Sequence, residues 1–177
     1  AVTANAVVAP DGTTTADTLT DDATDDFHAV YDGITLATAT DVSLSVYAKA
    51  GTHNYVTLRY SGAAENFISA VFDLSDTNAT VRSEQDVGTT SGTIAATKQE
   101  NIGNGWFRLT LVGKISEANR TFVIGFAEAA TGNTFGTTGA VTYVGTSTTL
   151  HLWGAQAELG TVATSYVPTY AATATRA

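Results

Sequence analysis

Short stretches in which apolar and polar residues alternate recur throughout this chain of 177 residues, and turn-forming residues separate them. In Asp41–Ala50, the residues Val42, Leu44 and Val46 fall on one side of an extended strand, whereas Tyr47 falls on the other. Because successive side chains of a β-strand point to opposite faces, such alternation is typical of strands with one buried face. The pattern predicts an all-β fold of antiparallel strands.

Ten segments carry this strand pattern. They are Ala6–Ala9, Thr14–Thr20, Phe27–Thr35, Asp41–Ala50, Asn54–Ser61, Phe67–Leu74, Thr93–Asn101, Trp106–Val112, Thr121–Glu128 and Thr148–Ala157. No segment between them has a convincing helical period, so the strands favour one antiparallel sandwich or barrel. We expect residues 1–169 to form a single β-sandwich domain and residues 170–177 to form an extended tail. The Gly- and Thr-rich stretch Ala129–Val144 is expected to be a long loop with one short strand.

The link Gly51-Thr52-His53 is short and begins with glycine, which predicts a β-hairpin between Asp41–Ala50 and Asn54–Ser61. The apolar faces of this hairpin and of the later segments predict a set of largely buried residues. They are Val42, Leu44, Val46, Val56, Leu58, Leu109, Leu111, Ile124, Leu150 and Leu152.

Composition narrows the function classes. The 17 acidic residues outnumber the 8 basic ones, and the net charge of -9 disfavours nucleic acid and anionic membranes as partners. The chain has no cysteine, which excludes disulfides and thiolate metal sites, and no apolar run reaches the roughly 18 residues of a membrane helix. Methionine is also absent, even at position 1, so we expect a processed chain or a piece of a longer polypeptide.

No motif for catalysis is recognisable. The histidines His28, His53 and His151 do not have metal-ligand spacing, and the chain contains neither H-E-x-x-H nor G-x-S-x-G nor a phosphate-binding glycine loop. The carboxylates could supply an acid and a base, but nothing in the sequence pairs them. We therefore expect a protein that is not an enzyme.

The acidic run Asp21-Asp22-Ala23-Thr24-Asp25-Asp26 is the best candidate for a cation site. Calcium takes several oxygen ligands, which clustered carboxylates and backbone carbonyls can supply, so Asp21, Asp22, Asp25 and Asp26 are the candidate ligands. The spacing does not match an EF-hand loop. A solvated acidic loop is the simpler interpretation.

Aromatic residues on the polar faces of strands are candidates for carbohydrate binding, because sugar rings stack on aromatic rings. Tyr47, Tyr55 and Arg59 are the candidate contacts, since in the predicted hairpin they project together from two adjoining strands. Lys49 and Arg108 could add charged hydrogen bonds to an acidic sugar, or they could simply form a solvated face.

Two tryptophans leave two interpretations open. Trp106 shares a strand face with Arg108, and Trp153 shares one with His151. Each indole could stack on a sugar, or it could fill or cap the core of the sandwich.

Four segments, in chain order, resemble one family of β-sandwich domains. They are A-P-D-G-T-T-T-A-D-T-L at Ala9–Leu19, S-V-Y-A-K-A-G at Ser45–Gly51, N-I-G-N-G-W-F-R at Asn101–Arg108, and W-G-A-Q-A-E with A-T-S-Y-V-P-T between Trp153 and Thr169. The family comprises jelly-roll domains of phage virion proteins and of proteins that resemble carbohydrate-binding modules. Family members usually extend beyond both ends seen here, so we expect this chain to be a module of a longer polypeptide.

The resemblance implies a jelly-roll sandwich that works as a non-catalytic structural or adhesion module of a tail fibre, head fibre or capsid decoration protein. Its partners would be other virion subunits, copies of itself and surface polysaccharide, and its location would be the virion surface or the extracellular space. Carbohydrate-binding modules often carry a structural calcium that ties the two ends of the domain together, which adds Asp17 and Glu158 as metal candidates. The alternatives are a carbohydrate-binding module of a secreted polysaccharide-degrading enzyme and, third, a polysaccharide lyase or hydrolase itself.

Overall fold

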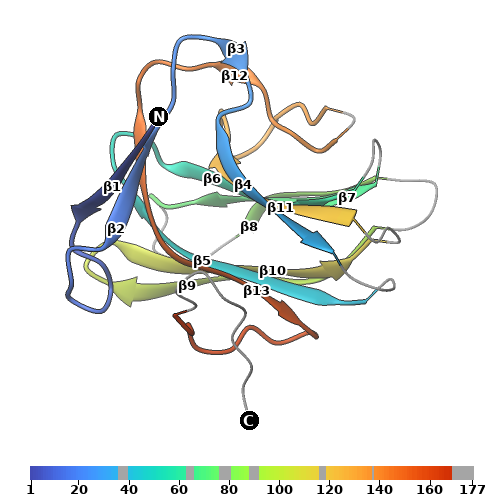
Figure 1. Cartoon of the computed structure of the whole chain (residues 1–177). Coiled ribbons are helices and arrows are strands. Elements are labelled where there is room, and N and C mark those ends of the chain that lie inside the picture. Colours follow the sequence, from blue (N-terminus) through green and yellow to red (C-terminus); the bar gives the residue numbers. More distant parts are fainter. Residues whose placement is uncertain are drawn as a thin grey trace.

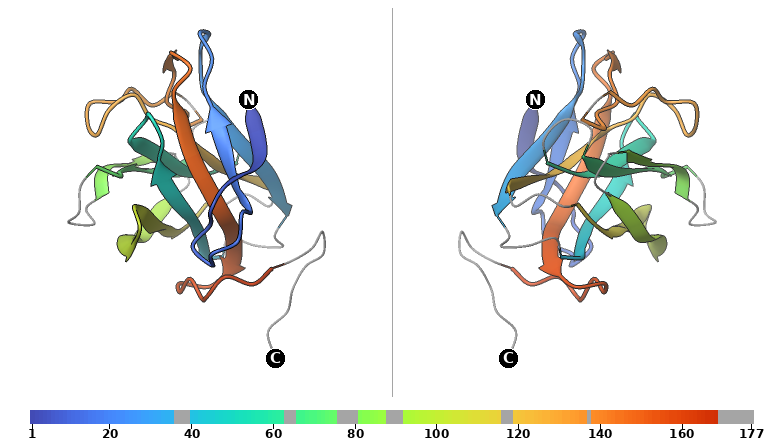
Figure 2. Two further views of the ribbon diagram at one scale, coloured as in Figure 1. Left: turned by 90° about the vertical axis from the view of Figure 1, so that its left-hand side faces the viewer. Right: turned by 90° about the vertical axis from the view of Figure 1, so that its right-hand side faces the viewer.

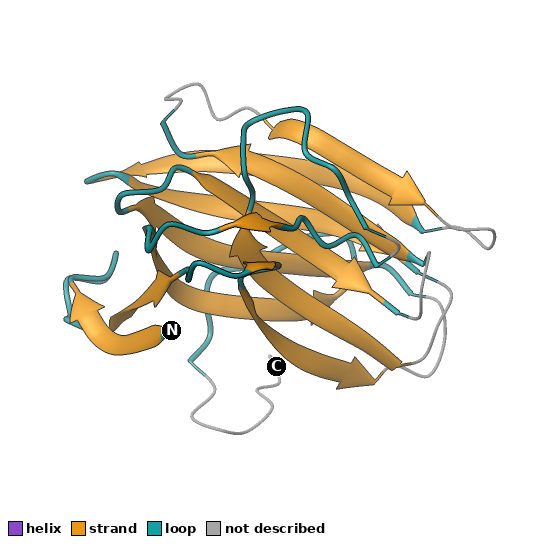
Figure 3. Cartoon of the chain, turned by 90° about the horizontal axis from the view of Figure 1, so that it is seen from above, coloured by secondary structure: helices purple, strands orange, loops and turns teal. Residues whose placement is uncertain are grey.

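A computed structural model of the chain describes residues 1–35, 40–62, 66–75, 81–87, 92–115, 119–136 and 138–168. The described part contains no helix, and its strands all pair antiparallel (Figure 3). The strands are β1 (Val2–Val7), β2 (Ala16–Thr20), β3 (Asp25–Asp26), β4 (Ala29–Thr35), β5 (Val42–Ala50), β6 (Tyr55–Ser61), β7 (Phe67–Asp73), β8 (Val81–Val87), β9 (Thr93–Gly103), β10 (Trp106–Lys114), β11 (Asn119–Phe126), β12 (Tyr143–Val144) and β13 (Thr149–Leu159). The all-β prediction is confirmed.

Two sheets form the layers of a sandwich (Figure 1). The first has six strands in the order β1-β2-β13-β5-β10-β9, and the second has five in the order β4-β11-β6-β7-β8. A small ribbon of β3 and β12 lies at one end, at the top of Figure 1. Strands from the two ends of the sequence lie side by side, because β13 pairs with β2 (Figure 2).

The predicted hairpin between β5 and β6 is wrong. β5 pairs with β10 and β13 in the six-stranded sheet, whereas β6 pairs with β7 and β11 in the other sheet. The link Gly51-Thr52-His53 therefore crosses from one sheet to the other instead of folding back within one. Thr52 and His53 both bond to Thr149 at the start of β13, which holds the link against the end of that strand.

The core lies between the sheets, and all ten residues predicted to be buried belong to it, with exposed fractions of 9% or less. It also contains five large aromatic side chains, namely Tyr60, Phe72, Phe107, Phe122 and Phe126. Alternation therefore predicted correctly which face of each of these strands points inward.

The outer face of the six-stranded sheet is also covered. Ser43 and Ser45 point outward from β5, yet their exposed fractions are 0% and 1%. The segment of residues 160–168, called here the closing segment, crosses this face below the lower sheet in Figure 1. It is held there because Arg108 donates to the carbonyl of Thr164, and the N–H of Val167 donates to Gln156.

Both tryptophans lie on this outer face, where they belong to a second, smaller hydrophobic cluster, and not between the two sheets. Trp106 is 2% exposed, and it packs with Ala9 and Ala16 of the N-terminal part. Trp153 and Tyr47 are partly buried against the same cluster.

The remaining predictions concern the stretch Ala129–Val144, the strand β8 and the C-terminal tail. The stretch Ala129–Val144 does contain a short strand, β12, and one isolated bridge between Phe135 and Val141. β8 was not predicted, because its sequence V-R-S-E-Q-D-V is too polar to show a buried face. The expected tail of residues 170–177 lies outside the described residues. Among the described residues, no helix is long and apolar enough to span a membrane.

Candidate functional site

Asp21 is buried at the end of the sandwich where β2 leads into β3, and protein donors occupy both of its carboxylate oxygens. The N–H of Thr148 donates to Oδ1 at 2.5 Å, and the hydroxyls of Thr148 and Tyr143 donate to Oδ2 at 2.7 Å each. Burial raises the pKa of Asp21, but the hydrogen bonds from Thr148 and Tyr143 outweigh it and hold the pKa below its usual value. A cation at Asp21 would have to displace these donors.

The remaining acidic candidates do not join Asp21 in one group. Asp22 accepts hydrogen bonds from the backbone and hydroxyl of Thr24, and Asp25 and Asp26 are exposed on β3. Among the described residues, no group of three or more histidine and acidic side chains is placed to hold a metal ion. The calcium site stays a prediction.

Asp17 and Glu158 lie on opposite faces of the six-stranded sheet, so one cation cannot bridge them. Asp17 lines an inner hollow and accepts a hydrogen bond from the N–H of Asn5 at 2.9 Å. Glu158 faces outward, and the N–H and hydroxyl of Thr164 in the closing segment donate to it. Glu158 does tie the end of the chain to the sheet, but by hydrogen bonds between protein groups.

His53 completes the network around Asp21. Its Nε2 lies 2.7 Å from the carbonyl of Ala127 and its Nδ1 lies 3.3 Å from the hydroxyl of Thr148. Its ring stacks with that of Tyr143 at 6.1 Å. Burial lowers the pKa of His53, and the Ala127 carbonyl and Asp21 oppose that shift without reversing it. The hydroxyl of Thr148 therefore links the histidine to the carboxylate at this end of the sandwich.

The three candidate contacts for carbohydrate do not share a face. Tyr47 lies on β5 in the six-stranded sheet, whereas Tyr55 and Arg59 lie on β6 in the other. The predicted arrangement, in which one saccharide bridges all three, is therefore wrong, and the reason is the crossing link Gly51-Thr52-His53.

Arg59 and Tyr55 are engaged by neighbouring segments. Arg59 is 7% exposed, and its guanidinium donates to the carbonyl of Thr138 at 2.7 Å and lies over the ring of Phe27. Burial lowers the pKa of Arg59. Tyr55 packs edge-on against His53 at 5.6 Å. The loop before β12 thus covers this part of the five-stranded sheet.

Tyr47 instead opens onto a groove of about 480 Å³ on the outer face of the six-stranded sheet. The groove runs between the turn that follows β1 and the turn that joins β9 to β10. Its lining residues are Val8, Ala9, Pro10, Tyr47, Lys49, Ile102, Gly103, Asn104 and Trp106. We regard it as the candidate binding site.

The pairing of β5 explains why these side chains meet. Tyr47 stands between Arg108 of β10 and Trp153 of β13, and Lys49 stands between Trp106 and His151 of the same strands. The ring centroid of Tyr47 lies 5.3 Å from that of Trp153, and the Arg108 guanidinium lies 5.6 Å from it. Neighbours on both sides therefore fix the orientation of the tyrosine ring.

The groove is locally cationic, although the chain is acidic. Lys49 is its only charged lining residue, and it forms no ion pair with any residue that the structure describes. Burial lowers the pKa of His151 beside it, and the charge of Lys49 lowers it further.

Sequence reasoning missed the rims of this groove. Val8 and Ile102 are 57% and 43% exposed and stand at its two sides, and Asn104 lies in the intervening turn with a φ of 54°. The dipeptide Asn104-Gly105 is typical of a turn, but the sequence alone does not show that this turn faces the one near Pro10. The two turns meet because Ala9 and Ala16 of the N-terminal part pack on Trp106, at the start of β10.

Comparison with protein-family models gives no match for this chain, and comparison with curated proteins gives none.

Proposed function

We propose that this chain is a non-catalytic adhesion module of jelly-roll type, and that it binds an acidic polysaccharide in the groove beside Tyr47. The groove carries the proposal, because it combines an aromatic ring, amide hydrogen-bonding groups and an ammonium group that pairs with no carboxylate of the described residues. The resemblance to virion domains supports a place in a phage fibre or capsid decoration protein.

Strand order supports the jelly-roll assignment. The chain alternates between the two sheets from β2 to β4, β5 and β6, and it alternates again from β10 to β11 and β13. Four neighbouring strands from each sheet supply the eight strands of a double-sheet jelly roll. They are the central β2-β13-β5-β10 of the first sheet and β4-β11-β6-β7 of the second, in which β8 is an added edge strand.

Tyr47 supplies the stacking surface, since the C–H faces of a sugar pack on an aromatic ring while nearby polar groups bond its hydroxyls. Asn104 and the backbone of Gly103 are polar groups on the opposite rim. Trp106 is too deeply buried to stack on a ligand. It forms part of the base of the groove beneath the exposed lining residues.

Lys49 selects for acidic sugars. A neutral polysaccharide would leave its ammonium without an ionic partner, whereas a uronate carboxylate or a sulfate would form a charge-assisted hydrogen bond. The net charge of -9 repels polyanions at long range, so specific pairing at Lys49 must overcome this repulsion. The lining residues include no carboxylate or histidine, which favours binding over acid–base cleavage.

The direct test is titration of the purified chain with polygalacturonate and with a neutral β-glucan. We expect Tyr47→Ala to weaken polygalacturonate binding about tenfold or more, which equals about 1.4 kcal/mol. Lys49→Gln should remove the preference for the acidic polymer. Tyr47→Phe should bind nearly as the parent chain, because stacking needs only the ring.

Tyr55→Ala is the matched control, because it removes a tyrosine from the other sheet. If Tyr55→Ala reduced binding and Tyr47→Ala did not, the groove would be the wrong site. Absence of binding to every polysaccharide would overturn adhesion and favour a purely structural virion role. The gene sequence around the module tests its setting: a capsid anchor or fibre repeat supports a virion, and a catalytic domain supports an enzyme-attached module.

A further inference from the structure

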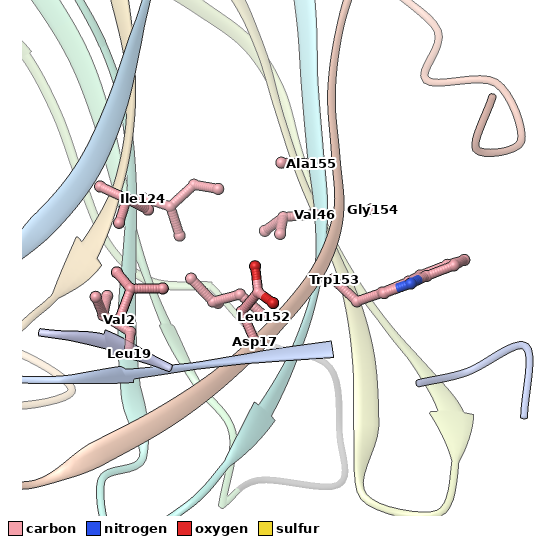
Figure 4. Close-up of a pocket in the computed structure, with 10 residues that line it drawn as sticks. Val2, Asp17, Leu19, Val46, Ile124, Leu152, Trp153, Gly154 and Ala155 are labelled. Carbon is pink, nitrogen blue, oxygen red and sulfur yellow. The ribbon is translucent and has the colours of Figure 1, made fainter. Parts of the chain in front are cut away.

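A second hollow lies between the two sheets, beside the point where β2 and β13 stop pairing at Asp17 and Leu152 (Figure 4). Its volume is about 170 Å³. It is lined by Val2, Asp17, Leu19, Val30, Val46, Ile124, Leu152, Trp153, Gly154 and Ala155. It is separate from the groove at Tyr47, which lies on the outer face of the sheet.

A bulge in β13 creates this hollow. Trp153 pairs with Tyr47 and Gln156 pairs with Ser45, so two residues of β13 stand opposite the single residue between Tyr47 and Ser45. The two bulged residues are Gly154, with a φ of 60°, and Ala155. Because both are small, the inner layer of side chains is incomplete at this position.

The walls are aliphatic and come from both sheets. Val46 and Leu152 belong to the six-stranded sheet, and Val30 and Ile124 belong to the five-stranded one. Among the described residues that line the hollow, Asp17 alone is charged. In Figure 4 its carboxylate points into the hollow near Leu152 and Val46, whereas the indole of Trp153 points away.

Asp17 has capacity for a cationic partner. The N–H of Asn5 donates to its Oδ1 at 2.9 Å, and Asp17 forms no ion pair with any residue in the described part of the chain. The side chain is partly buried beside apolar walls, where its attraction for a cation exceeds that of a fully solvated carboxylate.

We propose that this hollow binds a small organic ammonium ion. The ammonium group pairs with Asp17, and the apolar body of the ligand packs against Val46, Ile124 and Leu152. The volume suits this class, since a protein cavity of about 150 Å³ accepts benzene.

Calcium fits the hollow poorly. It requires six to eight oxygen ligands, whereas one carboxylate among aliphatic side chains offers two. An ammonium group needs only a few acceptors, and its hydrocarbon stem gains from the apolar walls.

The test titrates the full chain with benzylammonium chloride and with benzyl alcohol, its neutral analogue, and follows amide chemical shifts by NMR. We expect benzylammonium to shift the resonances of Asp17, Val46 and Ala155, and to bind at least about tenfold more tightly than benzyl alcohol. Asp17→Asn should abolish that preference, because it keeps an acceptor for Asn5 but removes the charge.

Ala155→Leu provides a second variant, since it should fill the hollow and weaken both ligands while leaving Asp17 in place. Ile102→Ala, on the rim of the outer groove, is the control and should change neither affinity. Equal binding of benzylammonium to the parent chain and to Asp17→Asn would overturn the proposal. So would shifts confined to the outer groove, or no shifts at all.

Discussion

At the scale of single residues, surroundings decide the role of each carboxylate more than residue type does. Asp21 is buried and accepts hydrogen bonds on both oxygens, whereas Asp25, in the same acidic run, is exposed. Asp17 faces an apolar hollow with part of its bonding capacity unused. Of these three residues, only Asp21 accepts hydrogen bonds on both carboxylate oxygens from residues that the structure describes.

Asp21→Asn should destabilise the fold by about 2–3 kcal/mol, because an NH₂ group would replace an acceptor that faces the donors of Thr148 and Tyr143. Urea denaturation at pH 7 measures the loss. Asp25→Asn is the matched exposed control and should leave the midpoint unchanged. Equal losses in the two variants would show that the network around Asp21 contributes nothing.

Acid should destabilise the protein through His53. Its pKa is lower in the folded protein than its ordinary value of 6.5, so below that pH the unfolded chain binds more protons than the folded one. Stability should therefore be full above about pH 7.5 and fall as the pH drops through 6.5. The melting temperature between pH 5.5 and 8 checks this.

His53→Gln is expected to flatten this pH dependence, apart from a remainder due to His151, whose pKa is also lowered. In a variant that lacks both histidines, the melting temperature should change little between pH 6 and 8. A slope that survives the double substitution unchanged would refute the assignment.

At the scale of elements, the closing segment gives the outer face of the six-stranded sheet its buried character. Tyr166 packs on the indole of Trp153, with 4.7 Å between ring centroids, and lies over Gly154. The bulge at Gly154 allows this contact, because a side chain added there would meet the rings of Tyr166 and Tyr47 at about 3.2 and 3.3 Å.

Tyr166→Ala should expose Trp153 and shift its fluorescence to longer wavelength, with a loss of about 1 kcal/mol in unfolding free energy. Trp106, which is 2% exposed, should keep its emission and serve as an internal reference. Tyr166→Phe keeps the ring and should behave as the parent chain. A spectrum unchanged in Tyr166→Ala would mean that the closing segment does not shield Trp153 in solution.

At the scale of the whole molecule, strands distant in sequence form the sheets. Leu19 pairs with Leu150, and Trp106 pairs with Lys49. Such pairings require large loops to close before they contribute any stability. The order of the strands, rather than local propensity, therefore controls how fast the chain folds.

Refolding should occur on a timescale of milliseconds to seconds, as for other all-β sandwiches dominated by non-local pairing. Stopped-flow fluorescence after dilution from urea measures it, with the two tryptophans as probes. Completion within microseconds would contradict the role given to long-range pairing.

Local sequence determined the strands and their inward faces. Alternation of period two predicted nine strands within a few residues of their observed bounds, and all ten residues that it predicted to be buried are buried, because it reports which side of a strand faces the core. The predicted strand Ala6–Ala9 shares only two residues with β1. It missed β8, which shows no apolar face.

Only the tertiary structure decided which strands are neighbours. Those neighbours in turn determine which residues form the candidate site. A short link led by Gly51 is compatible with a hairpin and with a crossing between sheets, and local propensity cannot separate them. Because β5 and β6 pair in different sheets, Tyr47 is separated from Tyr55 and Arg59. The pairing of β5 with β10 instead places Tyr47 and Lys49 beside the β9–β10 turn, more than fifty residues away in sequence. Strand faces follow from neighbours in sequence, whereas a binding surface depends on contacts between distant segments, which only the folded chain brings together.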